Sequence, residues 1–134
     1  IYGIAADSNA PYLNYTKFTV GLTAGGTPVD IAKMAISYVD EGMRWTGADY
    51  GNMIINVTES DVNKGTPAWG LNTTINADPD RLLEQGEQFV MFIAVPNTAT
   101  PGKQFTINLQ PAEGAAYPIK RNVPAGIDKV NILF

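Results

Sequence analysis

The sequence predicts an all-β fold, an antiparallel immunoglobulin-like β-sandwich. Short apolar or alternating runs recur roughly every 8–12 residues, as in many sandwiches. Most of the 13 Gly and 9 Pro residues fall between these runs, where turns are expected. No long stretch keeps the apolar spacing of a helix. The Cys and Trp pattern of antibody domains is missing, so a β-barrel built from the same strands remains the alternative.

The first half of the chain contains two alternating runs. Residues 17–23 alternate apolar with small or polar side chains, and residues 34–39 do the same before a turn at residues 40–42. Each run predicts a half-buried strand. The inward-facing side chains are expected to be Phe18, Val20, Leu22, Met34, Ile36 and Tyr38.

Two further strands are expected at residues 53–58 and 68–75, separated by a polar turn at residues 60–65. In the second of these strands, alternation predicts one common face for Trp69, Leu71, Thr73 and Ile75. Residues 81–86 follow as a connection, predicted to be a single helical turn that ends at Gly86.

The most apolar run, residues 89–95, is too short to cross a bilayer and is bounded by turn residues. It predicts a central strand that is buried on both faces. One face would pack into the core of the domain, and we expect a partner to cover Val90, Phe92 and Ala94. A turn at residues 100–103 then leads into a strand at residues 105–109.

Composition narrows the function classes. The chain has 134 residues, enough for one domain (residues 1–134), and a net charge of −4, which argues against binding to nucleic acid or to anionic membranes. It has neither Cys nor His, which removes thiolate and imidazole catalysis, and the sequence predicts no enzyme. Since the chain starts at Ile1, we expect a fragment of a longer protein that carries no membrane segment itself.

Three Asn residues fit the Asn-x-Ser/Thr pattern of N-glycosylation: Asn14, Asn56 and Asn72. If their apolar neighbours face the core, period-2 alternation turns all three outward, where a glycan fits without clash. The alternative is that they are ordinary polar residues of an outer β face. We expect an N-linked glycan on at least one of them.

Other polar and aromatic clusters are weaker signals. Carboxylates gather at Asp40/Glu41, Asp78/Asp80 and Glu84/Glu87, where turn and cap roles are the expected ones, and a divalent cation near Asp78 and Asp80 is left unassigned. No catalytic, cofactor-binding or metal residue is therefore predicted. Flat rings could form a sugar-binding platform, but a place in the core or in an interface is favoured for all three of Trp45, Tyr50 and Trp69.

Three stretches in order resemble the archaellins, the subunits of the archaeal swimming filament. Residues 25–33, a Gly-rich turn followed by Pro-Val-Asp-Ile, resemble the family's entry into its second strand. Gln85-Gly86-Glu87 is similar to the turn before the family's most apolar strand. The spacing of a closing Pro-x-x-Gly-Ala motif is reproduced by Pro111, Gly114, Ala115, Ile119 and Pro124.

The resemblance implies an outer, non-catalytic β domain that lacks the family's N-terminal hydrophobic helix. It implies an extracellular, cell-surface filament, a homopolymer assembled through the missing helix and through lateral contacts between β domains. Family members are commonly N-glycosylated, which again points to the three Asn residues. Two alternatives remain: an accessory, stator-type archaellum domain that binds the surface layer, and a carbohydrate-binding β-sandwich module.

Overall fold

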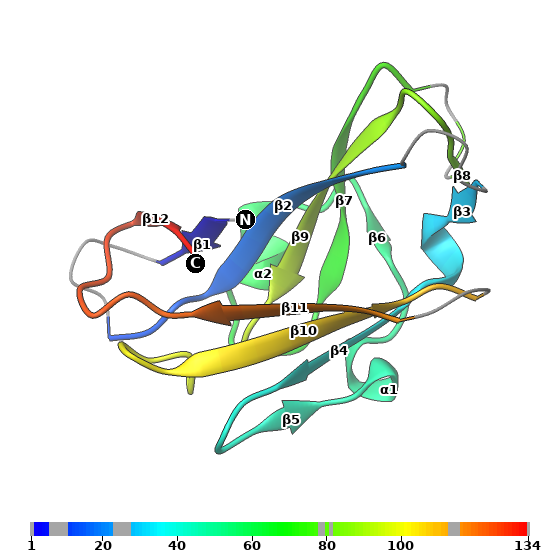
Figure 1. The fold of residues 1–134 in the computed structure, drawn as a ribbon. Helices are drawn as coiled ribbons and strands as arrows, with labels where there is room; N and C mark the ends of the chain where they lie inside the picture. The colour runs from blue at the N-terminus through cyan, green and yellow to red at the C-terminus, as the bar shows by residue number, and fades with distance from the viewer. Residues whose placement is uncertain are drawn as a thin grey trace.

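Strands form most of the chain in the computed structural model, which describes residues 2–5, 11–22, 28–77, 80, 82–112 and 116–133. A six-stranded sheet has the order β12-β1-β2-β9-β7-β6 and a four-stranded sheet the order β11-β10-β4-β5 (Figure 1). The six strands are β1 (Tyr2–Ile4), β2 (Tyr15–Gly21), β6 (Ile54–Ile55), β7 (Trp69–Ile75), β9 (Gln88–Ala94) and β12 (Val130–Ile132). The four are β4 (Ala35–Val39), β5 (Arg44–Trp45), β10 (Gln104–Gln110) and β11 (Tyr117–Asn122).

Smaller elements complete the described part of the chain. Strands β3 (Val29–Asp30) and β8 (Leu82–Leu83) pair with each other, and the short helices are η1 (Ile31–Lys33), α1 (Gly47–Tyr50) and α2 (Glu59–Val62). The strand pairs are antiparallel except β6 with β7, which is parallel. The fold is therefore mostly β with antiparallel sheets. No described helix is long and apolar enough to span a membrane.

One apolar cluster joins the two larger sheets. Strands β2, β4 and β10 alternate buried and more exposed side chains, as expected for sheets with one face in the core and one face in solvent. Strands are confirmed close to the predicted positions at residues 17–23, 34–39 and 105–109. Of the six inward-facing side chains expected there, Phe18, Met34, Ile36 and Tyr38 are buried, while Val20 and Leu22 are half-buried.

Strand β9 lies in the middle of the six-stranded sheet, between β2 and β7. Every residue from Phe89 to Val95 is at most 6% exposed, so the strand is buried on both faces, as predicted. The expectation that a partner covers Val90, Phe92 and Ala94 is wrong, because other parts of the same chain already bury them.

The region between β5 and β7 differs most from the prediction. Instead of one strand at residues 53–58 and a polar turn, the chain forms the two-residue strand β6 and the helix α2. Helix α2 begins with a capping box, in which Asp61 Oδ2 accepts hydrogen bonds from the Thr58 backbone N–H at 2.9 Å and from the Thr58 hydroxyl at 3.0 Å. The helix turns Val62 completely inward, and this anchor holds the segment against the sheet.

Strand β7 contains an irregularity that interrupts the predicted alternation. Leu71 pairs with Met91 and Thr73 pairs with Val90, so one extra residue is inserted between them. Trp69 and Leu71 are buried as predicted, whereas Thr73 and Ile75 are exposed. The helical turn predicted at residues 81–86 is also wrong: residues 82–83 form β8, and Gly86 adopts a positive φ of 85° in the turn before β9.

Candidate interaction surfaces

A cover segment, residues 46–62, buries the outer face of β9. The Tyr50 hydroxyl donates a hydrogen bond of 2.6 Å to the carbonyl oxygen of Ala94. The Tyr15 hydroxyl on β2 donates one of 2.9 Å to Glu59 Oε1 in α2, and the Tyr15 ring lies 4.9 Å from that of Phe92. Burial raises the pKa of both phenols, and the Glu59 hydrogen bond raises that of Tyr15 further, so both groups remain donors at neutral pH.

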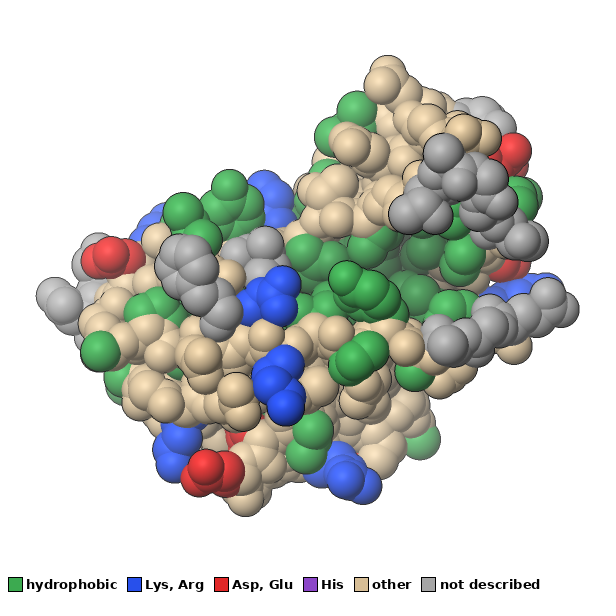
Figure 2. Space-filling model, in the orientation of Figure 1, with side chains coloured by type: hydrophobic (Ala, Val, Ile, Leu, Met, Phe, Trp, Pro, Cys, Tyr) green, Lys and Arg blue, Asp and Glu red, His purple; other side chains and the backbone are tan. Residues whose placement is uncertain are grey.

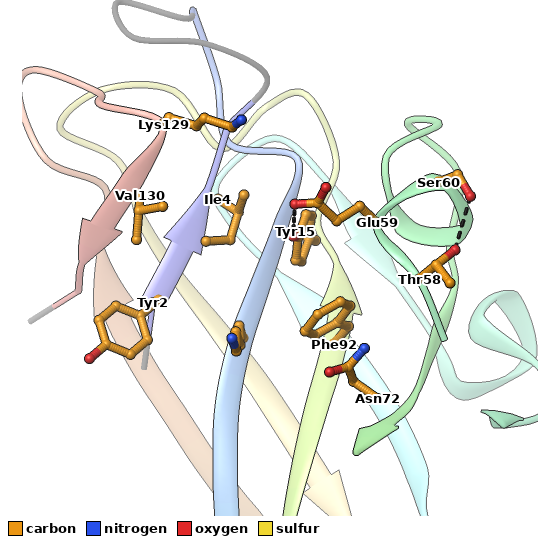
Figure 3. A pocket seen from close by; sticks show the side chains of 11 residues that line it. Tyr2, Ile4, Tyr15, Thr58, Glu59, Ser60, Asn72, Phe92, Lys129 and Val130 are labelled. Carbon is orange, nitrogen blue, oxygen red and sulfur yellow. Dashed lines mark hydrogen bonds between the residues drawn. The ribbon is translucent and has the colours of Figure 1, made fainter. Parts of the chain in front are cut away.

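A shallow hollow of about 780 Å³ lies beside the cover segment (Figure 3). Tyr2, Ile4 and Val130 line one side of it, and Thr58, Glu59 and Asn72 line the other, with Phe92 between them. The hollow also contains the basic side chains of Lys17 and Lys129. The hollow combines apolar side chains with polar and charged ones, a composition that protein contact surfaces share.

An apolar strip borders this hollow on the two strands at the edge of the sheet. It consists of Tyr2 on β1 with Val130 and Ile132 on β12, which are 45%, 57% and 60% exposed. Tyr2 and Ile132 are directly opposite each other in the register, so their side chains are neighbours on one face. The sequence does not predict the strip, because its residues come from opposite ends of the chain. Only the pairing of β1 with β12 brings them together.

An apolar groove of about 500 Å³ opens between the two larger sheets, and Figure 2 shows it as a green hollow. Its lining comes from β2, β3, β8, β10 and β11 and from residues near them. The apolar members are Phe18, Val20, Leu22, Val29, Ile31, Met34, Leu83, Leu109, Pro111, Tyr117 and Ile119. Among the described residues that line the groove, Arg121 carries a charge. The groove fits an apolar occupant, because few polar groups converge on it.

The three sequon Asn residues have different surroundings. Asn56 is exposed and sits in a left-handed turn at φ 57°, a conformation that Asn tolerates. Asn14 and Asn72 are half-buried. Asn72 Nδ2 donates a 2.8 Å hydrogen bond to the carbonyl oxygen of Val57, and Asn14 Oδ1 is buried with no hydrogen-bond partner among the described residues. The uniform outward alternation expected around the sequons is wrong at Ile55 and Thr73, which are exposed.

The aromatic residues considered for a sugar platform lie in the core. Trp45, Tyr50 and Trp69 are at most 8% exposed, and the rings of Trp45 and Tyr50 meet edge to face at 5.7 Å. The Trp69 indole N–H donates to the carbonyl oxygen of Gly51 at 3.2 Å. The core interpretation of these residues is therefore confirmed.

The acidic clusters serve turns where the structure describes them. Carboxylate oxygens of Asp80, Glu84 and Glu87 lie within 4.8 Å of one another. Asp80 accepts a hydrogen bond from the Leu82 N–H and Glu87 from the Glu84 N–H, so local turn geometry accounts for two of the three. Asp78 lies outside the described residues, as do residues 25–27, Gly114 and Ala115 of the quoted motifs.

Asp40 connects the β4–β5 turn to the turn after β9. One carboxylate oxygen accepts from the Tyr38 and Thr98 hydroxyls at 2.7 and 2.6 Å, and the other accepts from the Gly42 and Met43 N–H groups at 2.8 Å. Burial alone would raise the pKa of Asp40, but these hydrogen bonds outweigh it and hold the pKa below its ordinary value.

We expect Asp40→Ala to lower the unfolding free energy by about 1.5–3 kcal/mol, the usual value of hydrogen bonds to a charged group. Because the folded-state pKa is depressed, this stability is complete above the ordinary Asp pKa of about 3.9 and is lost as the pH falls toward the lower folded value. Urea unfolding at several pH values should therefore show a gap between the two proteins that narrows in acid.

The matched control for Asp40→Ala is Glu41→Ala. Glu41 is exposed and makes one 3.5 Å ion pair with Lys103, so its removal should change the unfolding free energy by less than about 1 kcal/mol. Equal losses for the two variants, or a gap that does not depend on pH, would contradict the role given to Asp40.

Comparison with known proteins identifies the family. A model of the archaeal-type flagellin family matches residues 1–121. The chain belongs to this family. Archaellins, as its members are called, are the non-catalytic structural subunits of the archaeal flagellum, a filament at the cell surface. The resemblance drawn from the Gly-rich turn, the Gly86 turn and the closing motif is thus confirmed.

Two curated relatives are similar to parts of the chain. A probable flagellin 1 from Archaeoglobus fulgidus is 26% identical over 123 residues, which cover 87% of this chain and 59% of the relative. A probable flagellin 1 from Aeropyrum pernix is 31% identical over 62 residues, covering 46% of this chain and 30% of the relative. This archaellin chain therefore spans less than two thirds of the length of either relative.

Two solved structures share the fold. Archaeal flagellin FlaB1 from Methanocaldococcus jannaschii superposes with a TM-score of 0.65 at 13% identity, covering 98% of this chain and 91% of that one. The archaeal flagellum of Methanospirillum hungatei strain JF1 gives a TM-score of 0.57 at 16% identity, covering 98% and 70%. At these identities, the superpositions establish the common fold.

Proposed function

We propose that this archaellin chain is a structural subunit of a swimming filament and supplies its outer β domain. The observation that carries the proposal is the family match, which extends over residues 1–121. The described residues fit a structural role, because their acidic and aromatic clusters serve turns and the core. The subunit polymerises with other copies outside the cell, and the polymer is turned by a motor without chemistry in this domain.

The experiment is electron microscopy of cells that produce the complete protein, compared with cells from which its gene is deleted. The proposal expects surface filaments that disappear on deletion and return when the gene is restored. An antibody raised against residues 1–134 should decorate the filament along its length. Filaments that persist unchanged in the deletion strain, with no decoration in the parent, would refute the proposal.

We also propose that residues 1–134 form one domain of immunoglobulin-like sandwich type. The support is the pair of larger sheets that contribute to a single apolar cluster, with antiparallel pairing in all but β6 and β7. The same proposal includes assembly through a hydrophobic helix, which is not among the described residues, and through contacts between β domains.

Asn56 is the proposed acceptor of an N-linked glycan. The glycan joins the side-chain nitrogen, and Asn56 is exposed, whereas the nitrogen of Asn72 is hydrogen-bonded and Asn14 is half-buried. We expect mass spectrometry of peptides from native filaments to find a glycan on Asn56. Asn56→Gln should remove that mass increment, and Asn72→Gln should leave it in place. Unmodified Asn56 in native material would contradict the proposal.

A further inference from the structure

The Asn56 sequon lies in the cover segment, whereas the other two sequons lie on or beside central strands of the six-stranded sheet. Asn72 is in β7 and Asn14 directly precedes β2, and both strands pair with β9. The hydroxyl of Thr16, the third residue of the Asn14 sequon, donates to the carbonyl oxygen of Ile93, and Thr16 is fully buried. Of the three sequons, the one at Asn56 is therefore the one that can move without breaking the pairing with β9.

Val57, the middle residue of the Asn56 sequon, anchors the tripeptide to the sheet. Its side chain is fully buried, and its N–H donates to the carbonyl oxygen of Leu71 at 3.1 Å. Its own carbonyl oxygen accepts the 2.8 Å hydrogen bond from the side chain of Asn72. The backbone of the tripeptide is thus fixed on both sides of Val57, and it does not leave the sheet while these contacts hold.

Thr58, the third residue of the same sequon, is held by the capping box of α2. Asp61 Oδ2 accepts both its backbone N–H and its hydroxyl, and the hydroxyl oxygen also lies 2.9 Å from Ser60 Oγ. The hydrogen bonds from the Thr58 N–H and hydroxyl lower the pKa of Asp61, so the acceptor is a carboxylate at neutral pH. Hydrogen bonds to an ionised acceptor are the stronger kind, and the Thr58 hydroxyl is therefore engaged in the helix cap.

Attachment of an N-linked glycan uses both ends of the sequon. The Asn56 side-chain nitrogen forms a bond to the anomeric carbon of a glycosyl phosphate donor and loses one proton to the transferase. The bond from that carbon to the phosphate oxygen breaks, and the phosphate leaves with the electron pair. Because the motif also requires a hydroxyl at its third position, the transferase must contact that hydroxyl together with the Asn. In the closed domain Asn56 is exposed, but Asp61 occupies the Thr58 hydroxyl.

We propose that Asn56 receives its glycan while the α2 end of the cover segment is open, and that Asp61 and Asn72 control how often this end opens. This inference rests on the glycan proposed above for Asn56. Opening releases the Thr58 hydroxyl and frees the tripeptide, and local opening needs less free energy than global unfolding. Because Asn56 is exposed in the closed state, the glycan stays outside when Val57 returns to the core. Asn72 then acts as a clamp on the neighbouring sequon.

The test measures glycan transfer to the complete protein made in a host without N-glycosylation. The folded protein is incubated with membranes from native cells, which supply the transferase and the glycosyl donor, and mass spectrometry follows the rate of modification at Asn56. We expect Asp61→Ala and Asn72→Ala each to raise this rate by about 5–30-fold, the factor by which loss of one such interaction shifts an opening equilibrium. A synthetic peptide of residues 52–62, which has no sheet to pack on, should also be modified faster than the unsubstituted protein.

The matched control is Asp49→Ala, which removes an equivalent capping box at the start of α1. Asp49 Oδ2 accepts from the Thr46 N–H at 2.7 Å and from the Thr46 hydroxyl at 3.0 Å, the same pair of contacts that Asp61 makes. The α1 end contains no sequon, and the hydrogen bond from Tyr50 to Ala94 holds it separately. Asp49→Ala should therefore leave the rate of transfer within about twofold of that of the unsubstituted protein.

Two results would overturn the inference while the proposed glycan stands. The first is an unchanged rate in Asp61→Ala or in Asn72→Ala, since the inference requires both contacts to hold the sequon closed. The second is a rate in Asp49→Ala as high as theirs, which would mean that general loosening governs transfer. Unmodified Asn56 in native filaments, together with an unmodified peptide, is a distinct result: it refutes the proposed glycan, and the inference with it.

Discussion

Phe92→Ala should lower the unfolding free energy by about 3–5 kcal/mol, as deep core truncations of Phe do. Phe92 is 6% exposed under Tyr15 on the outer face of β9, and Ile93 is fully buried on the inner face. Ile93→Ala should therefore cost a comparable amount, about 2–5 kcal/mol. Urea unfolding of the three proteins measures the difference, and it tests whether both faces of β9 belong to the interior of one chain.

Val130→Ala is the matched control for Phe92→Ala. Val130 borders the same hollow but is 57% exposed, so its truncation should change stability by no more than about 0.5 kcal/mol. If Phe92→Ala cost as little as Val130→Ala, the cover segment would not lie over β9 in solution, and a partner would again be needed to bury that face.

Gly70→Ala should destabilise the chain by about 3 kcal/mol or more, at or beyond the usual upper end for overpacking. A Cβ atom at position 70 would collide with the carbonyl oxygen of Ile54 and would lie 2.9 Å from Val57 Cβ. Because the first of these atoms is backbone, rotation of a side chain cannot relieve the collision. The parallel β6–β7 pair would have to separate, which loosens the cover segment.

The control for Gly70 is Gly126→Ala, since no heavy atom lies within 4 Å of a Cβ built there. It should alter stability by less than about 0.5 kcal/mol. Hydrogen exchange adds a positional readout: in the Gly70 variant, the Val57 amide, which donates to the Leu71 carbonyl oxygen, should exchange faster than amides of β10. Uniform changes over both regions would mean that β6 and the core unfold as one unit.

The alternating and apolar runs were the reliable part of the sequence. Strand β9 could be placed from seven apolar residues, and β4 from Ile36 and Tyr38, because burial imposes a short period that the sequence displays directly. What covers β9 could not be foreseen. The cover segment depends on the distant contacts of Tyr15 with Glu59 and of Tyr50 with Ala94, which leave no local pattern.

Other errors have local causes. The Thr58-x-x-Asp61 pattern is typical of a helix start. It indicates that α2 begins where the sequence analysis expected a polar turn. The β7 irregularity interrupts the alternation after Leu71, and a strict period of two does not predict such a break. The sequons were visible as motifs, but only the surroundings of Asn56, Asn14 and Asn72 separate the exposed Asn from the half-buried ones.

The pairing of β1 with β12 makes one step of folding depend on both ends of the chain. Tyr2 lies opposite Ile132, and the Asn131 amide donates to the carbonyl oxygen of Gly3, so these contacts join opposite ends of the chain. Contacts of such sequence separation form slowly and need the last residues to be present. The strip therefore comes into being only when folding is complete. A chain whose last residues have not yet folded does not present the strip.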